Sequence, residues 1–440
     1  MHATQNPYHS WRSAAFTGSW LLYAGYYLCR ENLRTVYLLQ GSPFLAANLS
    51  HLLAAFALAY CIGHLVAGSW ADQPRSSGMN KWTSLVAGPR RVALLGGLIS
   101  ACATMAMLLV HTPQGLMGLQ LINGFGQGLG FPALARMLAV WFNRQERPGI
   151  LAWWSASYSL GGVLAASLTF WCATTQLFLP AWGWRRCLVL PPVLLIGISL
   201  WFYLVTRDEP ADIGLEPICN LPASTPQWKS GPIAGWWSVL ACSRVRTISA
   251  MYFFLKMTRY ALLFWLPLYL VQTTHASAGR AGASASLFEL FGFAGALYAV
   301  HLSSRFFNGR RFPVAALLLF AVGILALLEP VIAQQGWTAS AVNIAAMGML
   351  VYAVDALMVS VAVLESVPLS HSARSIAVVN GSGSVGQMLA PLLVNWFAQT
   401  FGWENLFNLF LITSLIAAAI VAMHWNDEND NALEEAVLEA

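Results

Sequence analysis

Charged residues are scarce in this chain of 440 residues. Lys, Arg, Asp and Glu together make up only 9% of it, whereas 58% is hydrophobic, with 19 Trp and 23 Phe. A soluble protein carries about 25% charged residues, so an ordinary soluble domain is excluded. The composition indicates an all-α protein that crosses a membrane several times. The net charge of +5 does not indicate nucleic-acid binding, because the basic residues lie in short hydrophilic gaps.

Sequence motifs of catalysis are also missing. The chain contains no Walker A loop, no nucleophile–base arrangement and no cluster with metal-ligand spacing. Its seven cysteines lie mostly within apolar stretches and form no CxxC pair, which favours buried, inert thiols over disulfides or a metal site. We therefore expect no enzyme activity, no cofactor and no metal.

Long apolar stretches set the organisation of the chain. A membrane-spanning helix needs about 20 mainly apolar residues, and twelve segments meet this requirement. They are 14–38, 50–71, 91–111, 115–141, 149–174, 183–205, 248–272, 283–306, 312–333, 338–366, 374–399 and 403–424. A polar stretch with several prolines separates the sixth from the seventh. The predicted units are an N-terminal six-helix bundle (1–206), a linker (207–247), a C-terminal six-helix bundle (248–425) and an acidic tail (426–440).

The basic residues predict the orientation in the membrane. If both termini are cytoplasmic, sixteen of the 23 Lys and Arg residues fall in cytoplasmic gaps, four in external gaps and three within spans. This distribution follows the positive-inside rule. Two six-helix halves with a long central loop suggest an internal repeat, the architecture of major facilitator transporters. The pattern Gly68…Asp72…Arg75 after the second span is typical of that class, whereas its counterpart after the eighth span has Ser304 where an acid is expected.

The first span contains the stretch on which the functional prediction depends. Read as one helix, Tyr23, Tyr26, Tyr27 and Arg30 recur at helical spacing and share a face. An arginine inside a membrane helix is costly, so it tends to face a protein interior or an aqueous cavity. Arg also binds phosphate or carboxylate through two parallel hydrogen bonds. The alternative is that Arg30 has a structural acidic partner.

A second deep arginine lies in the seventh span. Arg259 is about eleven residues into its segment, roughly 16 Å along a helix and near the middle of a hydrocarbon core about 30 Å thick. Because spans one and seven begin the two halves, Arg30 and Arg259 should face each other. Such a pair predicts a site for a dianion such as a phosphate monoester. Lys256, three residues earlier, is either a further cation of this site or the partner of an acid.

Two acids lie deep within predicted spans. Glu289 and Asp355 are candidates for proton coupling or for structural pairing with Arg259 or Lys256, and the sequence leaves both interpretations open. A lone His within a span, here His64, is more often a packed, hydrogen-bonded residue than a titrating one. The glycine-rich run at 123–130 is predicted to let helices pack closely rather than to bind a nucleotide, because no strand precedes it.

Several motifs resemble one known family. The stretch Tyr26-Tyr-Leu-Cys-Arg30-Glu-Asn32 is similar to the Tyr-Tyr-Leu-x-Arg-Lys-Asn motif of the organophosphate:phosphate antiporters, which include glycerol-3-phosphate and hexose-6-phosphate transporters. Further similarity covers 141–149, 207–217, 255–270 and 401–403. The resemblance implies that Arg30 and Arg259 are the phosphate-binding arginines. It also implies a rocker-switch antiporter that exchanges an organophosphate for inorganic phosphate.

The chain departs from the family pattern at three positions of the implied site. The lysine after the first arginine is Glu31, the family's cavity lysine in span two falls on His64, and its histidine in span five falls on Tyr158. Two of these changes remove a cation, and Glu31 adds an anion. The resemblance thus adds His64 and Tyr158 to the candidate substrate-binding residues and leaves the identity of the substrate open.

Three functions remain in competition at this point. The first is a secondary transporter of a sugar phosphate or glycerol phosphate that exchanges it for inorganic phosphate. The second is an organic-anion/proton symporter that uses Asp355 or Glu289. The third is a transporter-like membrane sensor of sugar phosphate. In each case we expect a monomer in a bacterial inner membrane whose partners are a small anion and the lipid bilayer.

Overall fold

The computed structural model describes residues 7–30, 32, 43–73, 86–110, 112–218, 228–229, 231 and 233–427, and all regular secondary structure in these residues is helical. Glu31 lies outside the described residues, as do 219–227 of the predicted linker and 428–440 of the predicted tail. The N-terminal half contains α1 (Pro7–Tyr26), α3 (Pro43–Ala71), α5 (Pro89–Ala106), α6 (Pro113–Gly128), α7 (Gly130–Trp141), α8 (Arg147–Thr174) and α9 (Leu190–Val205). The C-terminal half contains α11 (Ser243–Thr274), α12 (Ala278–Phe306), α13 (Arg311–Ala333), α14 (Trp337–Asp355), α15 (Val363–Glu365), α16 (Ser372–Phe401) and α17 (Leu406–Ala422).

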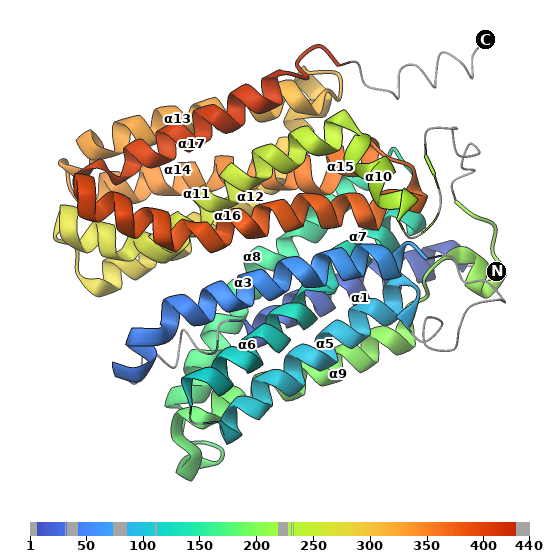
Figure 1. The fold of residues 1–440 in the computed structure, drawn as a ribbon, viewed down its shortest axis with the longest axis horizontal. Helices are drawn as coiled ribbons and strands as arrows, with labels where there is room; N and C mark the ends of the chain where they lie inside the picture. The colour runs from blue at the N-terminus through green and yellow to red at the C-terminus, as the bar shows by residue number, and fades with distance from the viewer. Residues whose placement is uncertain are drawn as a thin grey trace, which may run out of the picture.

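The helices form two bundles that lie side by side, α1 to α9 in one and α11 to α17 in the other (Figure 1). Helix α1 begins and α17 ends at the same end of the molecule (Figure 1). The bundles contact each other chiefly where α3 packs against α16 and where α8 packs against α12. The short helix α10 (Ala234–Ala241) lies in the stretch predicted as a linker and packs against α11 and α16.

Many of these helices can cross a membrane. Among the described residues, eight are long and apolar enough, and ten spans result if each of two bent pairs is one span. The bent pairs are η3 (Pro180–Leu188) with α9, at 44°, and the two parts of α11, at 57°. Helix α1 and the consecutive helices α6 and α7 lie in the remaining predicted segments, 14–38 and 115–141.

The bend in α11 has a local cause. Pro267 lies inside the helix, and the bend separates Ser243–Leu263 from Trp265–Thr274. A proline lacks the N–H that would bond to the carbonyl four residues earlier, here Leu263, and its ring clashes with that carbonyl. The straight part before the bend carries Lys256 and Arg259, so these cations are placed by a regular helix.

Close helix packing depends on glycine in both halves. A Cβ on Gly128 of α6 would lie 2.4 Å from the Tyr60 carbonyl oxygen of α3, and a Cβ on Gly295 of α12 would lie 1.9 Å from the Met349 carbonyl oxygen of α14. No larger side chain fits at such distances. Gly128 belongs to the glycine-rich run at 123–130, so the structure agrees with the prediction that this run allows close packing.

Asp72, which directly follows α3, connects the two halves. Its carboxylate accepts hydrogen bonds from the backbone N–H groups of Ala373, at 3.1 Å, and Arg374, at 2.9 Å, in the first turn of α16. It also forms an ion pair with Arg136 of α7 at 3.0 Å, and its side chain is fully buried. A carboxylate is favourable at a helix N-terminus, where backbone N–H groups lack helical partners.

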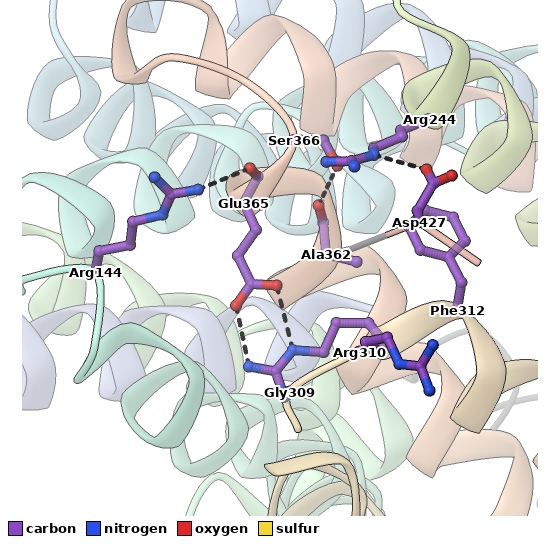
Figure 2. Close-up of a pocket in the computed structure, with 10 residues that line it drawn as sticks. Arg144, Arg244, Gly309, Arg310, Phe312, Ala362, Glu365, Ser366 and Asp427 are labelled. Carbon is purple, nitrogen blue, oxygen red and sulfur yellow. Dashed lines mark hydrogen bonds and ion pairs between the residues drawn. The ribbon is translucent and has the colours of Figure 1, made fainter. Parts of the chain in front are cut away.

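A second contact between the halves lies beside a pocket (Figure 2). The Glu365 carboxylate forms two hydrogen bonds with the Arg311 guanidinium, at 3.1 and 3.2 Å. Arg144, from the segment between α7 and α8, reaches the Glu365 carbonyl oxygen, and Arg244 pairs with Asp427 on the other side of the pocket (Figure 2). Glu365 is therefore a structural partner of Arg311.

Replacing Asp72 with Asn should weaken the junction between the halves. The amide keeps the size of the side chain but removes the charge that pairs with Arg136 and with the N-terminus of α16. We expect a loss of about 1–3 kcal/mol, measured as a lower thermal unfolding temperature of the detergent-solubilised protein. Glu404→Gln, which removes an exposed carboxylate, is the matched control. An unfolding temperature unchanged in Asp72→Asn would contradict this role.

Candidate substrate-binding site

Arg30 lies just beyond the end of α1. The helix ends at Tyr26 and continues as a single 3₁₀ turn, η1 (Tyr27–Cys29), closed by a hydrogen bond of 3.0 Å from the Arg30 N–H to the Tyr27 carbonyl oxygen. A 3₁₀ turn has three residues per turn instead of 3.6. The predicted face shared by Tyr23, Tyr26, Tyr27 and Arg30 is therefore not continuous.

The 3₁₀ turn after α1 leaves Tyr26 pointing away from Tyr27 and Arg30. The Tyr26 hydroxyl donates a 2.6 Å hydrogen bond to the carbonyl oxygen of Ala93 in α5, and its side chain is fully buried in the N-terminal half. Tyr23 lies closer to the group around Arg30, with its hydroxyl 3.4 Å from that of Tyr60. The structure thus brings Tyr23 and Tyr27 near Arg30 and directs Tyr26 into the core.

Neutral groups surround Arg30. Its Nε donates a 2.7 Å hydrogen bond to the side-chain oxygen of Gln127 in α6. Its guanidinium carbon lies 4.4 Å from the ring centroid of Tyr27 and 5.1 Å from that of Tyr60. Such contacts stabilise a cation through the negative face of the ring. No carboxylate within the described ranges forms an ion pair with Arg30.

Tyr60 also contacts the opposite half. The Lys256 ammonium of α11 lies 5.2 Å from its ring centroid and 3.3 Å from the Ser384 hydroxyl of α16. Lys256 is 4% exposed. A single aromatic ring of α3 therefore lies against Arg30 from the N-terminal half and against Lys256 from the C-terminal half.

Arg259 has a different environment from Arg30. Its Nη1 donates a 2.8 Å hydrogen bond to Oδ2 of Asp355, and both side chains are buried. Its guanidinium carbon lies 3.9 Å from the ring centroid of Tyr352 and 5.2 Å from that of Tyr158. Tyr27 and Tyr260 each lie within electrostatic range of both arginines. The two arginines thus share aromatic neighbours, although only Arg259 has a carboxylate partner among the described residues.

The residues predicted from the family pattern lie in the same region. Tyr158 of α8 stacks on Tyr352 of α14 with ring centroids 5.9 Å apart, which joins the two halves. His64 is fully buried, with Nδ1 2.9 Å from the Tyr60 carbonyl oxygen and its ring 4.3 Å from the Tyr60 ring. His64 contacts the central group through Tyr60.

The two acids are placed differently. Asp355 ends α14 and is followed directly by a π-helical segment, η5 (Ala356–Ala362). Such wide turns occur often at functional sites. Glu289 of α12 accepts a 2.9 Å hydrogen bond from the Tyr352 hydroxyl. Both carboxylates therefore contact the immediate surroundings of Arg259, Asp355 directly and Glu289 through Tyr352.

Several buried polar atoms of this group have no hydrogen-bond partner within the described part of the chain. They are Nη2 of Arg30, Nε of Arg259, the hydroxyl of Tyr158 and Nε2 of His64. A buried polar atom without a partner costs about 1–3 kcal/mol, so four in one region need an explanation. The two arginine nitrogens can only donate a hydrogen bond, and the Tyr158 hydroxyl readily donates one. An anion with several oxygen acceptors would satisfy all three.

Sequence reasoning missed several residues of this group. Tyr60, Gln127 and Tyr352 contact the arginines, yet none was a candidate. Tyrosine and glutamine are common in apolar spans. Only the contacts between helices distinguish these three residues from other tyrosines and glutamines of the chain. Tyr60 lies four residues before His64 and so shares its helix face, which is the signal that was available.

The chain is similar in sequence to several known proteins. The chain is 27% identical over 421 residues to the glucose-6-phosphate exchanger SLC37A2 of Bos taurus, covering 86% of this chain and 82% of that protein. It is 24% identical to the glycerol-3-phosphate transporter of Bacillus subtilis, covering 95% and 93%. It is also 28% identical to the membrane sensor protein UhpC of Salmonella typhimurium, covering 74% and 71%. The predicted resemblance to the organophosphate:phosphate antiporters is thereby confirmed.

Solved structures show the same fold. The E. coli fucose:proton symporter FucP superimposes with a TM-score of 0.67 at 15% identity, covering 92% of this chain and 98% of that one. A bacterial homologue of the iron transporter ferroportin gives 0.69 at 12% identity, covering 95% and 99%. The predicted all-α membrane fold is therefore confirmed. The family model described as Major Facilitator Superfamily matches residues 16–255 and 248–437, and the chain belongs to that superfamily.

Proposed function

We propose that this protein is a secondary transporter of a phosphorylated organic anion, of the sugar phosphate or glycerol phosphate class, which it exchanges for inorganic phosphate. The observation that carries the proposal is a pair of arginines, the half-buried Arg30 and the buried Arg259, one from each half. Each has a buried donor without a partner among the described residues, and the two share tyrosine neighbours. Phosphate monoesters are close to dianionic at neutral pH and offer three strong acceptor oxygens. Arg binds such groups through charge-assisted hydrogen bonds.

The location of the arginines supports alternating access. Arg30 belongs to the N-terminal half and Arg259 to the C-terminal half, so a phosphate that binds both joins the halves. A dianion between them also compensates the repulsion of the two guanidinium groups. Once this anion leaves on the other side, the two cations are left uncompensated, and the empty site requires a second phosphate to take its place before the halves come together again. Exchange follows from this requirement.

The relatives support the substrate class. Those described as a glucose-6-phosphate exchanger and a glycerol-3-phosphate transporter align with most of this chain. The probable hexose phosphate transport protein of Chlamydia pneumoniae is 25% identical, covering 98% of this chain and 94% of that protein. A sensor function is the second candidate, because UhpC is described as a membrane sensor protein.

The orientation belongs to the same proposal. We infer that the end where α1 begins and α17 ends (Figure 1) faces the cytoplasm of a bacterial cell, and that the transporter acts as a monomer in its inner membrane. The support is the excess of Lys and Arg in the gaps on that side of the predicted topology.

Transport and sensing are separated by measuring flux. We expect proteoliposomes that contain the purified protein to take up labelled phosphate, and phosphate inside the vesicles to accelerate this uptake at least several-fold. Glucose 6-phosphate and glycerol 3-phosphate outside should compete with the label. Saturable binding of a phosphate ester without any uptake would instead support the sensor function, whereas uptake independent of internal phosphate would contradict exchange.

The arginine pair can be tested by substitution with Lys, which keeps the charge and loses the planar fork. A hydrogen bond to a charged group is worth about 1.5–3 kcal/mol, so Arg30→Lys and Arg259→Lys should each weaken phosphate binding roughly ten- to a hundredfold. Calorimetric binding and phosphate exchange provide the measurements. Arg186→Lys is the control, because the buried Arg186 bonds to the carbonyl oxygens of Ala173, Phe178 and Gly183. Parent-like binding by both site variants would refute the proposed site.

The orientation predicts which loops are accessible from each side. Glu209 lies after α9 and Gln176 lies after α8, and both are exposed. In intact cells, an impermeant thiol reagent should label Gln176→Cys and not Glu209→Cys, with the parent chain giving the background of the native cysteines. Opened vesicles should allow both to react. Labelling of Glu209→Cys from outside would reverse the orientation.

A further inference from the structure

Asp355 holds the arginine of the C-terminal half in a buried ion pair. The Arg259 Nη1 to Asp355 Oδ2 distance is 2.8 Å, and the two side chains are 9% and 6% exposed. Lys256 also lies within electrostatic range of Asp355. One carboxylate thus compensates cationic groups of α11 that the proposed function assigns to the substrate.

Arg30 provides the contrast within the same site. Its polar partner is the neutral side chain of Gln127, and its cation contacts are aromatic rings. Nη2 of Arg30 and Nε of Arg259 are both buried without a partner in the described residues. Among the described residues, a phosphate can therefore approach Arg30 without displacing an anion, whereas at Arg259 it meets a guanidinium that already bonds to a carboxylate.

We propose that Asp355 is an internal counter-anion that competes with the substrate phosphate for Arg259, and that it thereby lowers affinity and promotes release. This inference rests on the proposed function. Phosphate oxygens and a carboxylate are both acceptors for the same N–H groups. Two anions within a few ångströms of each other at a buried site repel strongly. Binding of phosphate to Arg259 then weakens the Arg259–Asp355 pair, and the pair strengthens when phosphate leaves.

The alternative role for Asp355 predicts the opposite effect of substitution. If the carboxylate only holds Arg259 in position, its loss frees the guanidinium and weakens phosphate binding. If it competes, its loss strengthens binding. The stacking of Arg259 on Tyr352, at 3.9 Å, remains in either case and limits how far the guanidinium can move.

The test compares the purified wild type with Asp355→Asn, Arg259→Gln and the double variant, using inorganic phosphate as the ligand in calorimetry. We expect Asp355→Asn to bind phosphate at least about tenfold more tightly, which corresponds to about 1.4 kcal/mol. We expect the double variant to bind no more tightly than Arg259→Gln, because the competition needs Arg259. Asp355→Ser, which also removes the carboxylate, is measured in parallel in case the Asn variant does not fold.

Glu329→Gln is the matched control for these variants. Glu329 is a fully buried carboxylate of the same half, and it accepts hydrogen bonds from Ser340 and Asn343 of α14. Its replacement should leave phosphate affinity unchanged. Equal or weaker phosphate binding by folded Asp355 variants overturns the inference alone, as does equal tightening in the Arg259→Gln background. Absence of phosphate binding by the wild type overturns both the inference and the proposed function.

Discussion

Three cations that lie among apolar helices impose the constraint on which the central part of this structure depends. A charged side chain removed from water is costly unless other groups compensate it. Within the described part of the chain, Arg30, Arg259 and Lys256 are compensated mainly by the faces of tyrosine rings and by one directly paired carboxylate, Asp355. Aromatic faces stabilise a cation without using its N–H donors. Nη2 of Arg30 and Nε of Arg259 therefore stay available for an anion, as neither has a partner among the described residues.

The same constraint joins the two halves. Tyr60 of the N-terminal half contacts Arg30 of its own half and Lys256 of the other, and Tyr158 stacks on Tyr352 across the boundary. The aromatic surroundings of Lys256 and Arg259 are complete only when the halves lie together, because Tyr60 and Tyr158 come from the N-terminal half. Asp72, bound to the first turn of α16, holds the halves together through a separate contact.

The sequence was sufficient to predict the membrane fold and the two arginines, because these depend on apolar length and on the cost of a charge in an apolar segment. It was insufficient where a contact between helices decides the outcome. Tyr26 was placed on the site face because the end of α1 and its 3₁₀ turn leave no clear mark in the sequence. Tyr60 and Tyr352 were missed because periodicity identifies a buried face without identifying its neighbours. The partner of Arg259 stayed open until the fold brought α11 beside the end of α14.

The asymmetry between the arginines suggests an order of events in transport. Arg30 has neutral partners, so it can bind a phosphate first at little cost in lost contacts. Arg259 must exchange one anionic partner for another, so it engages later and releases more readily. A site with two equally uncompensated arginines would hold a dianion more tightly, and slow release limits a carrier that must let its substrate go in every cycle. The Asp355 carboxylate beside Arg259 allows the two arginines to recognise a phosphate and still release it.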